Sequence, residues 1–252
     1  MIKQSGESRQ RWHRWEELKR HEIAALAPEA LVVIPVGAIE QHGPYLPTGT
    51  DITLSTRVVE LALDRVGVRA DAPFLFAPFL RIGCSAHHLP FGGTISLSPK
   101  LMIDVLVEAM LSMTASGVRR IVLVNGHGGN TGVCHAAASD AAARSDLVIA
   151  AVDYWEFASA AETLPQPGHA GWFETSLMLA ARPDCVAGDR EPRPADEAMQ
   201  PGRGIYGREV WAGIDGYTDQ PASATADHGS EILEGIVHQL ADRLVGLAQE
   251  MR

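Results

Sequence analysis

Cysteine and basic residues are scarce in this 252-residue sequence, and each shortage excludes a class of protein. The three cysteines, Cys84, Cys134 and Cys185, lie far apart and form no CxxC pair. Such a set argues against a disulfide framework and a thiolate zinc site, and it suits a reducing compartment. With 21 Lys and Arg against 31 Asp and Glu, the formal net charge is −10. This balance argues against broad nucleic-acid binding, which needs clustered basic residues, but it allows a small-molecule ligand.

The sequence also lacks long apolar runs. Nothing approaches the roughly 18 consecutive apolar residues of a membrane helix, so we expect no membrane association. The N-terminal stretch MIKQSGESRQRWHRWEELKR is basic but has no apolar core, which predicts no secretory signal and a cytoplasmic protein. The length permits two domains, but single α/β domains of this size are common. We therefore expect one domain over residues 1–252.

Apolar runs of strand length alternate with amphipathic helical stretches along the chain. Strands are expected at residues 31–36, 74–80, 120–125 and 147–155, with Pro78 weakening or shortening the second. Helices are expected at residues 51–67, 98–117, 131–145 and 229–251. This alternation predicts an α/β fold with a mainly parallel sheet and helices on both faces. Residues 182–227 are irregular and rich in Pro and Gly, which is typical of either an active-site or interface loop or a surface excursion.

Residues that commonly bind metals follow each predicted strand. Ligands of open parallel sheets bind beyond the carboxyl ends of the strands, so these side chains are expected at one edge. In strand order they are Glu40, His42 and Asp51; then His87 and His88; then His127 in NGHGGN; then His169 and Glu174. This recurrence at one edge carries more weight than any single motif.

Glu40 and His42 are two residues apart, so an extended segment would project both side chains to the same side. Gly43 and Pro44 then turn the chain, which lets Asp51 return at the start of the next helix. This oxygen and nitrogen set suits Zn²⁺, Mn²⁺ or Fe²⁺, and Asp51 could bridge two ions. Taken singly, Asp51 could merely cap a helix and Glu40 could pair with an arginine. Together they favour a metal site.

The NGHGGN segment has two interpretations. Glycines beside a helix start could cradle a phosphate, but neither the GxxxxGK[ST] nor the GxGxxG pattern is present. Glycine on both sides of His127 lets the backbone approach a bound ion or substrate, which favours a ligand role. The backbone N–H groups of Gly128 and Gly129 are candidate oxyanion donors.

His169 and Glu174 are five residues apart, a spacing that would splay them by roughly 140° on a helix. Shared chemistry therefore requires His169 in the turn before a helix and Glu174 in its first turns. His87 and His88 are adjacent, so in an extended segment at most one of them would face the site.

The segments GAIEQHGPYLPTGTD, HHLPFGGTISL, NGHGGN and HAGWFETS together resemble the creatininase (creatinine amidohydrolase) family. The resemblance implies a three-layer α/β/α fold, a homohexamer and a centre of one or two divalent ions, with Zn²⁺ the first expectation and Mn²⁺ or Fe²⁺ the alternatives. It also implies hydrolysis of a non-peptide C–N bond, as in a cyclic amide or formamide. By position, Glu40, His42, Asp51 and His127 match metal ligands, and His169 matches a histidine that transfers protons.

Two departures from creatininase proper point to another branch of that family. Gly129 stands where creatininases carry a glutamate, so Glu174 is expected to complete the ligand set or to hold a water on the metal. Pro165 stands where they carry a tryptophan. The branch includes a formylamide hydrolase, a peptidase that matures the mycofactocin peptide and a keto-inositol hydrolase. Specificity is expected in residues 81–95, 154–168 and 200–222, with His88, Tyr154 and Trp155 as substrate-binding candidates.

The expected mechanism is metal-assisted hydrolysis, in which His169 or Glu174 passes a proton to the leaving nitrogen. Two alternatives remain open at this point. One is a protein that binds a small anion at the Gly-rich edge without turnover. The other is an isomerase or lyase that uses the same metal to stabilise an enolate.

Overall fold

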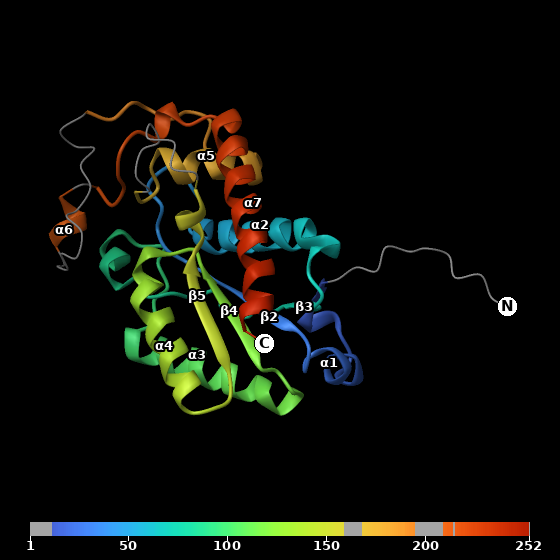
Figure 1. Cartoon of the computed structure of the whole chain (residues 1–252). Coiled ribbons are helices and arrows are strands. Elements are labelled where there is room, and N and C mark those ends of the chain that lie inside the picture. The colour runs from blue at the N-terminus through green and yellow to red at the C-terminus, as the bar shows by residue number, and fades with distance from the viewer. Residues whose placement is uncertain (1–11, 159–167, 195–208, 214, 252) are drawn as a thin grey trace.

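A parallel five-stranded sheet lies at the centre of the computed structural model, which describes residues 12–158, 168–194, 209–213 and 215–251. The strand order is β1-β3-β2-β4-β5, and each neighbouring pair runs parallel. The strands are β1 (Trp12–Arg14), β2 (Leu31–Val36), β3 (Phe74–Phe76), β4 (Arg120–Asn125) and β5 (Val148–Asp153). Because all of them run the same way, the loops that follow them meet at one edge, toward α5 in Figure 1.

Helices cover both faces of this sheet, which confirms the predicted α/β/α layers (Figure 1). One face carries α2 (Thr50–Val66), α5 (Trp172–Ala181) and α7 (Ala226–Glu250). The other carries α1 (Arg20–Leu26), α3 (Pro99–Met113) and α4 (Thr131–Ala143). A short helix, α6 (Glu209–Ala212), lies in the C-terminal part of the irregular region.

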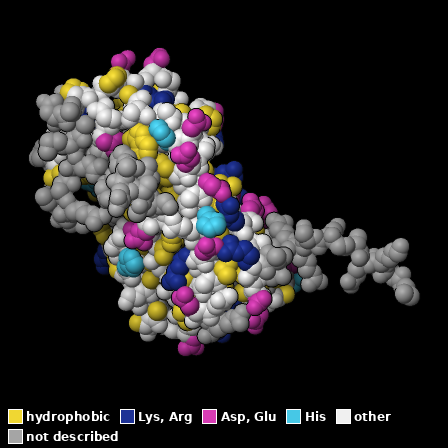
Figure 2. Space-filling model, turned by 45° about the horizontal axis from the view of Figure 1, so that its top comes forward, with side chains coloured by type: hydrophobic (Ala, Val, Ile, Leu, Met, Phe, Trp, Pro, Cys, Tyr) yellow, Lys and Arg dark blue, Asp and Glu magenta, His cyan; other side chains and the backbone are white. Residues whose placement is uncertain are grey.

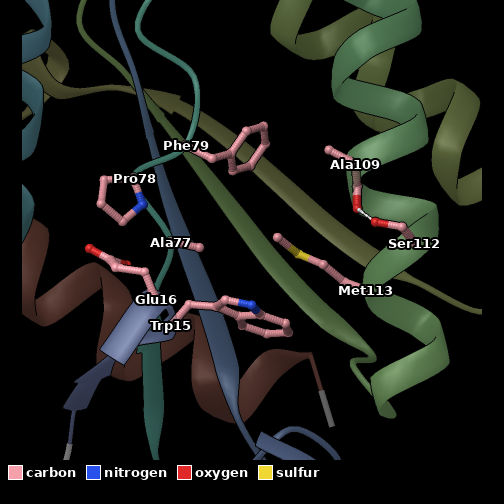
Figure 3. A pocket seen from close by; sticks show the side chains of 8 residues that line it. All are labelled: Trp15, Glu16, Ala77, Pro78, Phe79, Ala109, Ser112 and Met113. Atoms are coloured by element: carbon pink, nitrogen blue, oxygen red, sulfur yellow. Dashed lines mark hydrogen bonds between the residues drawn. The ribbon is translucent and has the colours of Figure 1, made fainter. Parts of the chain in front are cut away.

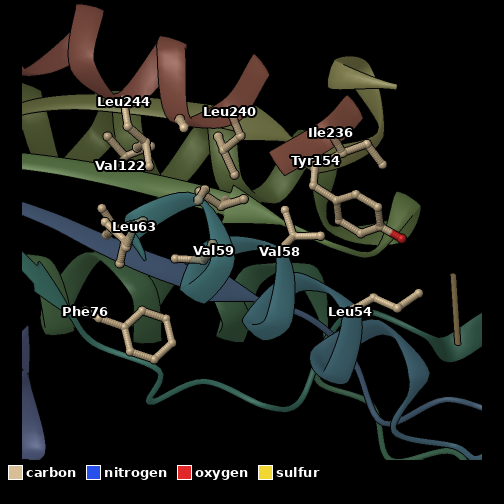
Figure 4. Close-up of a cluster of buried hydrophobic side chains, with 14 of the residues drawn as sticks. Leu54, Val58, Val59, Leu63, Phe76, Val122, Tyr154, Ile236, Leu240 and Leu244 are labelled. Atoms are coloured by element: carbon tan, nitrogen blue, oxygen red, sulfur yellow. The ribbon is translucent and has the colours of Figure 1, made fainter. Parts of the chain in front are cut away.

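Strand β2 shows why the sequence forms layers. Its side chains alternate, so Leu31 and Val33 join one hydrophobic cluster while Val32 and Ile34 join the other, and all four are fully buried. A strand buried on both faces needs a continuous apolar run, which is what the sequence has at 31–36. Figure 4 shows the first of these clusters, where side chains of α2 and α7 meet above the sheet.

Strands β2 and β4 begin and end at the predicted residues, but other boundaries differ. The second predicted strand stops at Phe76 because Pro78, two residues on, has no N–H to donate to a neighbouring strand. The fourth stops at Asp153, and a 3₁₀ helix (Tyr154–Phe157) replaces its predicted end. The last helix begins at Ala226, three residues earlier than predicted, because the Thr225 side chain caps it.

The N-terminal elements β1 and α1 were not predicted. Strand β1 has the sequence Trp-His-Arg and is only half-buried, so no apolar run marks it. It pairs with β3 at the sheet edge, where a strand needs partners on one side only. Trp12 packs its ring edge-on against Phe76 of the neighbouring strand.

No helix in the described part of the chain is long and apolar enough to cross a membrane. On the face shown in Figure 2, acidic, basic and histidine side chains are interspersed and do not gather into one basic field.

Candidate metal centre

Carboxylates and imidazoles from five segments converge at the carboxyl edge of the sheet. All of them are buried except His87, which is half-buried. The carboxylates are those of Glu40, Asp51 and Glu174, and the imidazoles are those of His42, His87, His88, His127 and His169. The edge that the sequence predicted as the site is therefore where these side chains meet.

The loop after β2 and the start of α2 position the first three residues. Glu40 and His42 lie two apart in this loop, and both side chains enter the cluster as the extended spacing predicts. Asp51 is the second residue of α2. Gly126, after β4, packs against this helix start: a Cβ there would lie 2.7 Å from Ser55 Cβ and 2.8 Å from the Asp51 carbonyl oxygen. Only glycine allows this approach.

Two asparagines of NGHGGN hold His127 in place. The side-chain oxygen of Asn125 accepts the backbone N–H of His127 (3.1 Å), and its amide donates to Asp153 at the end of β5 (2.7 Å). Asn130 accepts the backbone N–H of Cys84 in the segment after β3 (2.9 Å). These hydrogen bonds connect the loop that carries His127 to the end of β5 and to the segment after β3, and they restrict its backbone.

The turn before α5 positions His169 and Glu174 as their spacing requires. His169 precedes the helix, and Glu174 lies in its first turn. Between them, Ala170 has a φ of 54°, which is uncommon for a residue other than glycine. Its backbone N–H donates to Glu174 Oε2 (2.5 Å), and the same oxygen lies 3.8 Å from His42 Nε2.

Three histidines each donate one ring N–H to a backbone carbonyl. A carbonyl oxygen only accepts, so the nitrogen beside it must carry the hydrogen. The pairs are His42 Nδ1 with Glu40 O (2.9 Å), His127 Nε2 with Cys84 O (3.1 Å) and His169 Nε2 with Gln41 O (2.9 Å). This arrangement is typical of metal-binding histidines, because it fixes the tautomer and frees the other nitrogen.

The other nitrogen of each of these rings faces a carboxylate. His42 Nε2 lies 2.9 Å from Asp51 Oδ1, and His127 Nδ1 lies 3.2 Å from Asp51 Oδ2. His169 Nδ1 lies 3.3 Å from Glu40 Oε1. A nitrogen lone pair and a carboxylate oxygen repel unless a proton or a cation lies between them. Because the two oxygens of Asp51 face different rings, its geometry is compatible with the bridging role that the sequence predicts.

The buried carboxylate oxygens also fit a cation. Glu40 Oε1, Glu40 Oε2 and Asp51 Oδ2 are buried and accept no hydrogen bond from the described residues. Leaving such atoms unpaired is costly, and a divalent cation would satisfy them. Candidate donor atoms lie within 4.8 Å of one another in the sets Glu40–His42–His169, Glu40–His87–His127 and His42–Asp51–Glu174. Nitrogen and oxygen donors of this kind suit Zn²⁺, Mn²⁺ or Fe²⁺.

Burial and charge shift the pKa values of the cluster. Burial raises the pKa of both Glu40 and Glu174 to about 7. Burial opposes protonation of His42, but the neighbouring Asp51 charge outweighs it and raises the pKa to about 10. For His127 the charge of Glu40 and the contact with Asp51 likewise outweigh burial and raise the pKa to about 9. Protons therefore compete for the positions that a cation would take.

Both His87 and His88 face the cluster, so the expectation that at most one would do so is wrong. The expectation assumed an extended chain, whereas residues 86–91 form a 3₁₀ helix. The His87 ring lies nearly parallel to that of His127 (6.0 Å between ring centres), and His88 stacks on His169 (4.2 Å).

The remaining predicted residues lie around the cluster. Gly128 and Gly129 follow His127 directly and are exposed. A Cβ at Gly129 would collide with the Cys84 carbonyl oxygen and with His127 Nε2, so this backbone has no room for a glutamate there.

Tyr154 and Trp155 lie in a 3₁₀ helix against the hydrophobic core, with their rings 5.5 Å apart. The pKa of Tyr154 is raised by burial and by the charges of Glu174 and Asp51, so this tyrosine borders the cluster. The structure does not bring Trp155 into contact with the carboxylates among the described residues. Pro165 lies outside the described residues.

Two residues of the site were not among the individually predicted site residues, although Trp211 lies in the segment 200–222 that was expected to carry specificity. Trp211, on α6, covers three imidazoles, with ring centres 4.5 Å from His88, 5.4 Å from His169 and 5.6 Å from His87. It comes from an irregular segment whose path periodicity cannot predict. The other is Gln41, which an extended chain would point away from the site, yet its amide contacts His88.

A hollow of about 430 Å³ lies elsewhere, between α3 and the segment after β3 (Figure 3). Its lining is mostly apolar, and Glu16 is its one ionisable residue among those described. A single carboxylate offers much less acid–base and metal chemistry than the three carboxylates and five imidazoles of the edge cluster, so the edge cluster is the stronger candidate for a metal centre.

Comparison with known proteins agrees with this geometry. The family described as creatinine amidohydrolase (Creatininase) matches residues 16–244. The mycofactocin precursor peptide peptidase of Mycolicibacterium smegmatis is 34% identical over 224 residues, which cover 85% of this chain and 84% of that protein. The creatinine amidohydrolase of Pseudomonas putida is 28% identical over 262 residues, which cover 90% of this chain and 93% of that protein. A solved structure titled "Creatininase Mn" superposes with a TM-score of 0.79 at 27% identity, over 92% of this chain and 96% of that one.

Proposed function

Because this chain belongs to the creatinine amidohydrolase (creatininase) family of hydrolases, we propose that it hydrolyses an amide-type C–N bond with a divalent metal centre at the carboxyl edge of its sheet. The observation that carries the proposal is the set of buried, unpaired carboxylate oxygens of Glu40 and Asp51, faced by histidine nitrogens in ligand-type tautomers.

The proposed ligands are Glu40, His42, Asp51, His127 and Glu174, with Asp51 shared between two ions if both are present. Their distances and burial support this set. A bound ion of this kind would polarise the scissile carbonyl. It would also lower the pKa of a water molecule, which makes hydroxide available at neutral pH. Zn²⁺ is our first choice, with Mn²⁺ and Fe²⁺ as alternatives that use the same donors.

His169 and Glu174 are the proposed proton carriers. The Nε2–H of His169 is fixed on the Gln41 carbonyl, so Nδ1 is the atom that can accept a proton beside Glu40. Burial depresses the pKa of His169 well below its ordinary value, and a proton it accepts is therefore readily passed to a leaving nitrogen. Glu174, with a pKa of about 7, can hold a proton at neutral pH. The backbone N–H groups of Gly128 and Gly129, two exposed residues, are proposed to stabilise the developing oxyanion.

The proposed substrate is a small molecule with a non-peptide C–N bond, such as a cyclic amide or a formamide. We place it at the exposed Gly128–Gly129 edge of the cluster, with Tyr154, which borders the carboxylates, as a further substrate-binding candidate. Creatinine is a weaker candidate. Gly129 stands where creatininases carry a glutamate, and the backbone here has no room for that side chain.

A peptide bond is the second candidate. It is favoured by the identity of 34% with the M. smegmatis mycofactocin precursor peptide peptidase, against 28% with the P. putida creatinine amidohydrolase. A cytoplasmic location, a homohexamer and a single domain over the whole chain remain predictions.

The test combines metal analysis with a hydrolysis screen. Purified protein, with and without chelation, would be assayed with creatinine, formamides, lactams and short peptides in ¹⁸O-labelled water. We expect stoichiometric transition metal, turnover of one substrate class that chelation abolishes, and one ¹⁸O atom in the product. Full turnover by metal-free protein would contradict the proposal, and an unlabelled product would indicate an isomerase or lyase.

A further inference from the structure

His88 differs from the other buried histidines of the cluster in the direction of its hydrogen bonds. His42, His127 and His169 each donate one ring N–H to a backbone carbonyl and direct the other nitrogen at a carboxylate. Among the described residues the His88 ring has no carbonyl partner, and its Nδ1 lies 2.7 Å from the side-chain nitrogen of Gln41. Which atom donates there decides what the ring can do.

The Gln41 amide can adopt only one orientation. Its oxygen accepts the backbone N–H of Gly43 (2.9 Å), which can only donate. Its nitrogen donates to the carbonyl oxygen of Gly216 (2.5 Å), which can only accept. Reversing the amide would break both bonds, so the atom that faces His88 is the NH₂ group.

The second hydrogen of this NH₂ group goes to His88. The amide nitrogen also lies 3.2 Å from His169 Nε2, but that nitrogen already donates to the Gln41 carbonyl and has no lone pair to offer. His88 Nδ1 therefore accepts, and the hydrogen of the neutral ring is on Nε2.

That Nε2–H faces Glu40. His88 Nε2 lies 3.3 Å from Glu40 Oε1, and both atoms are buried and have no hydrogen-bond partner among the described residues. The His88 ring cannot turn freely because it packs between two other rings. Its centre lies 4.2 Å from that of His169, on which it stacks, and 4.5 Å from that of Trp211. A small adjustment of Glu40 closes the contact into a charge-assisted hydrogen bond.

We propose that His88, held in its Nε2–H tautomer by Gln41, is a positioning residue that donates to Glu40 Oε1 and leaves Glu40 Oε2 for the metal ion. This inference rests on the proposed function, because it assigns Glu40 as a ligand. It gives His88 a role other than substrate binding: the ring is fully buried, and each of its nitrogens is directed at a protein group.

Such a partner of a ligand typically contributes 10–100-fold to metal affinity. The donor also offsets part of the cost of burying the Glu40 carboxylate, which is fully buried. Metal binding should therefore depend on the N–H at the ε position of residue 88 and not on the ring itself.

A matched pair of substitutions tests this dependence. His88→Gln keeps an N–H group near the ε position, whereas His88→Asn reaches only the δ position, and both remove the ring. The dissociation constant for Zn²⁺ would be measured by competition with a chromophoric chelator, and the Co²⁺ absorption spectrum would report the ligand set. We expect His88→Asn to weaken Zn²⁺ binding roughly 10–100-fold and His88→Gln to recover most of that loss with a wild-type Co²⁺ spectrum.

Two results would overturn the inference while leaving the proposed function intact: unchanged Zn²⁺ affinity in His88→Asn, or equal losses in both variants, as a purely structural ring would give. Failure of the wild type to bind Zn²⁺, Mn²⁺ or Fe²⁺ would instead refute the proposed function. ¹⁵N NMR of the wild-type protein needs no substitution and applies even if a variant misfolds. It should show His88 protonated on Nε2 and unprotonated on Nδ1, and the opposite tautomer would refute the inference.

Discussion

At the scale of single residues, Asp51 connects two loops of the site, the one that carries His42 and the one that carries His127. Its Oδ1 faces His42 and its Oδ2 faces His127, so one carboxylate serves two imidazoles from different loops. Burial disfavours its charge, but the two histidines outweigh burial and hold its pKa below the ordinary value. Asp51 is therefore ionised over the whole physiological range and available to a cation.

Replacing Asp51 with Asn should remove metal binding while keeping the side-chain volume. We expect Zn²⁺ affinity to fall by more than the roughly 100-fold that loss of an outer partner causes, because a charged ligand is lost outright. The measurement is chelator competition, with the exposed Asp104→Asn as control. Wild-type affinity in Asp51→Asn would contradict its assignment as a ligand.

Replacing Glu174 with Gln should lower kcat by roughly 10²-fold or more, because the amide can neither carry the proton nor supply the charge. Glu156→Gln is the matched control, since Glu156 is exposed on the 3₁₀ helix after β5. Steady-state kinetics on the substrate found by the screen would measure both. An unaffected kcat in Glu174→Gln would remove Glu174 from the mechanism.

At the scale of elements, close packing of the loop after β4 against the start of α2 sets the geometry. Gly126→Ala places a methyl group within 2.8 Å of Ser55 and Asp51 atoms, and it should cost roughly 1–3 kcal/mol of unfolding free energy. Gly132→Ala, on α4 with no atom within 4 Å of the new Cβ, should be neutral or slightly stabilising. Denaturant unfolding compares the two. Equal effects would show that the close approach does not matter.

The elements that could be predicted are those with a physical signature in the sequence. Strands β2 and β4 are apolar runs and begin where predicted. Helix α3, with Ser98 as its N-cap followed by Pro99, begins within one residue of its predicted start. Strand β1 has no such signature: three half-buried residues become a strand only because β3 offers them an open edge. That information lies in the tertiary structure.

The same distinction applies to the site. Residues that follow strand ends, such as His127 and Glu174, could be predicted because parallel strands bring those ends together. The inward turn of both His87 and His88 could not, since it depends on a local 3₁₀ helix. Trp211 reaches the site from a segment without periodicity, and its position follows only from the folded chain.

At the scale of the whole molecule, the buried cluster makes stability depend on pH. In metal-free protein the pKa values of His42 and His127 are raised to about 10 and 9, and those of Glu40 and Glu174 to about 7. A group whose pKa is raised by folding contributes stability below its unfolded pKa and loses it as the pH rises through the folded value. All four groups therefore destabilise the metal-free protein as the pH increases: the two glutamates up to about pH 7, and the two histidines from there up to about pH 9 and 10.

We expect the Tm of chelated protein to fall between about pH 7 and pH 10, and to fall less with Zn²⁺ bound, because a cation replaces the protons. His88 and His169 have lowered pKa values, so they reduce stability only below about pH 6.5 and do not affect this window. Thermal melts with and without Zn²⁺ measure both curves. A chelated Tm that is constant or rises over this range would contradict the shifts.

The central claim is that side chains between positions 40 and 174 of the chain bind a common cation at one edge of the sheet. Anomalous diffraction from metal-loaded crystals at the absorption edge of the metal tests it most directly. The account predicts one or two peaks within bonding distance of Glu40, His42, Asp51 and His127, with Asp51 touching each. A metal-loaded crystal without a peak there, or with its peak bound by other residues, would contradict it.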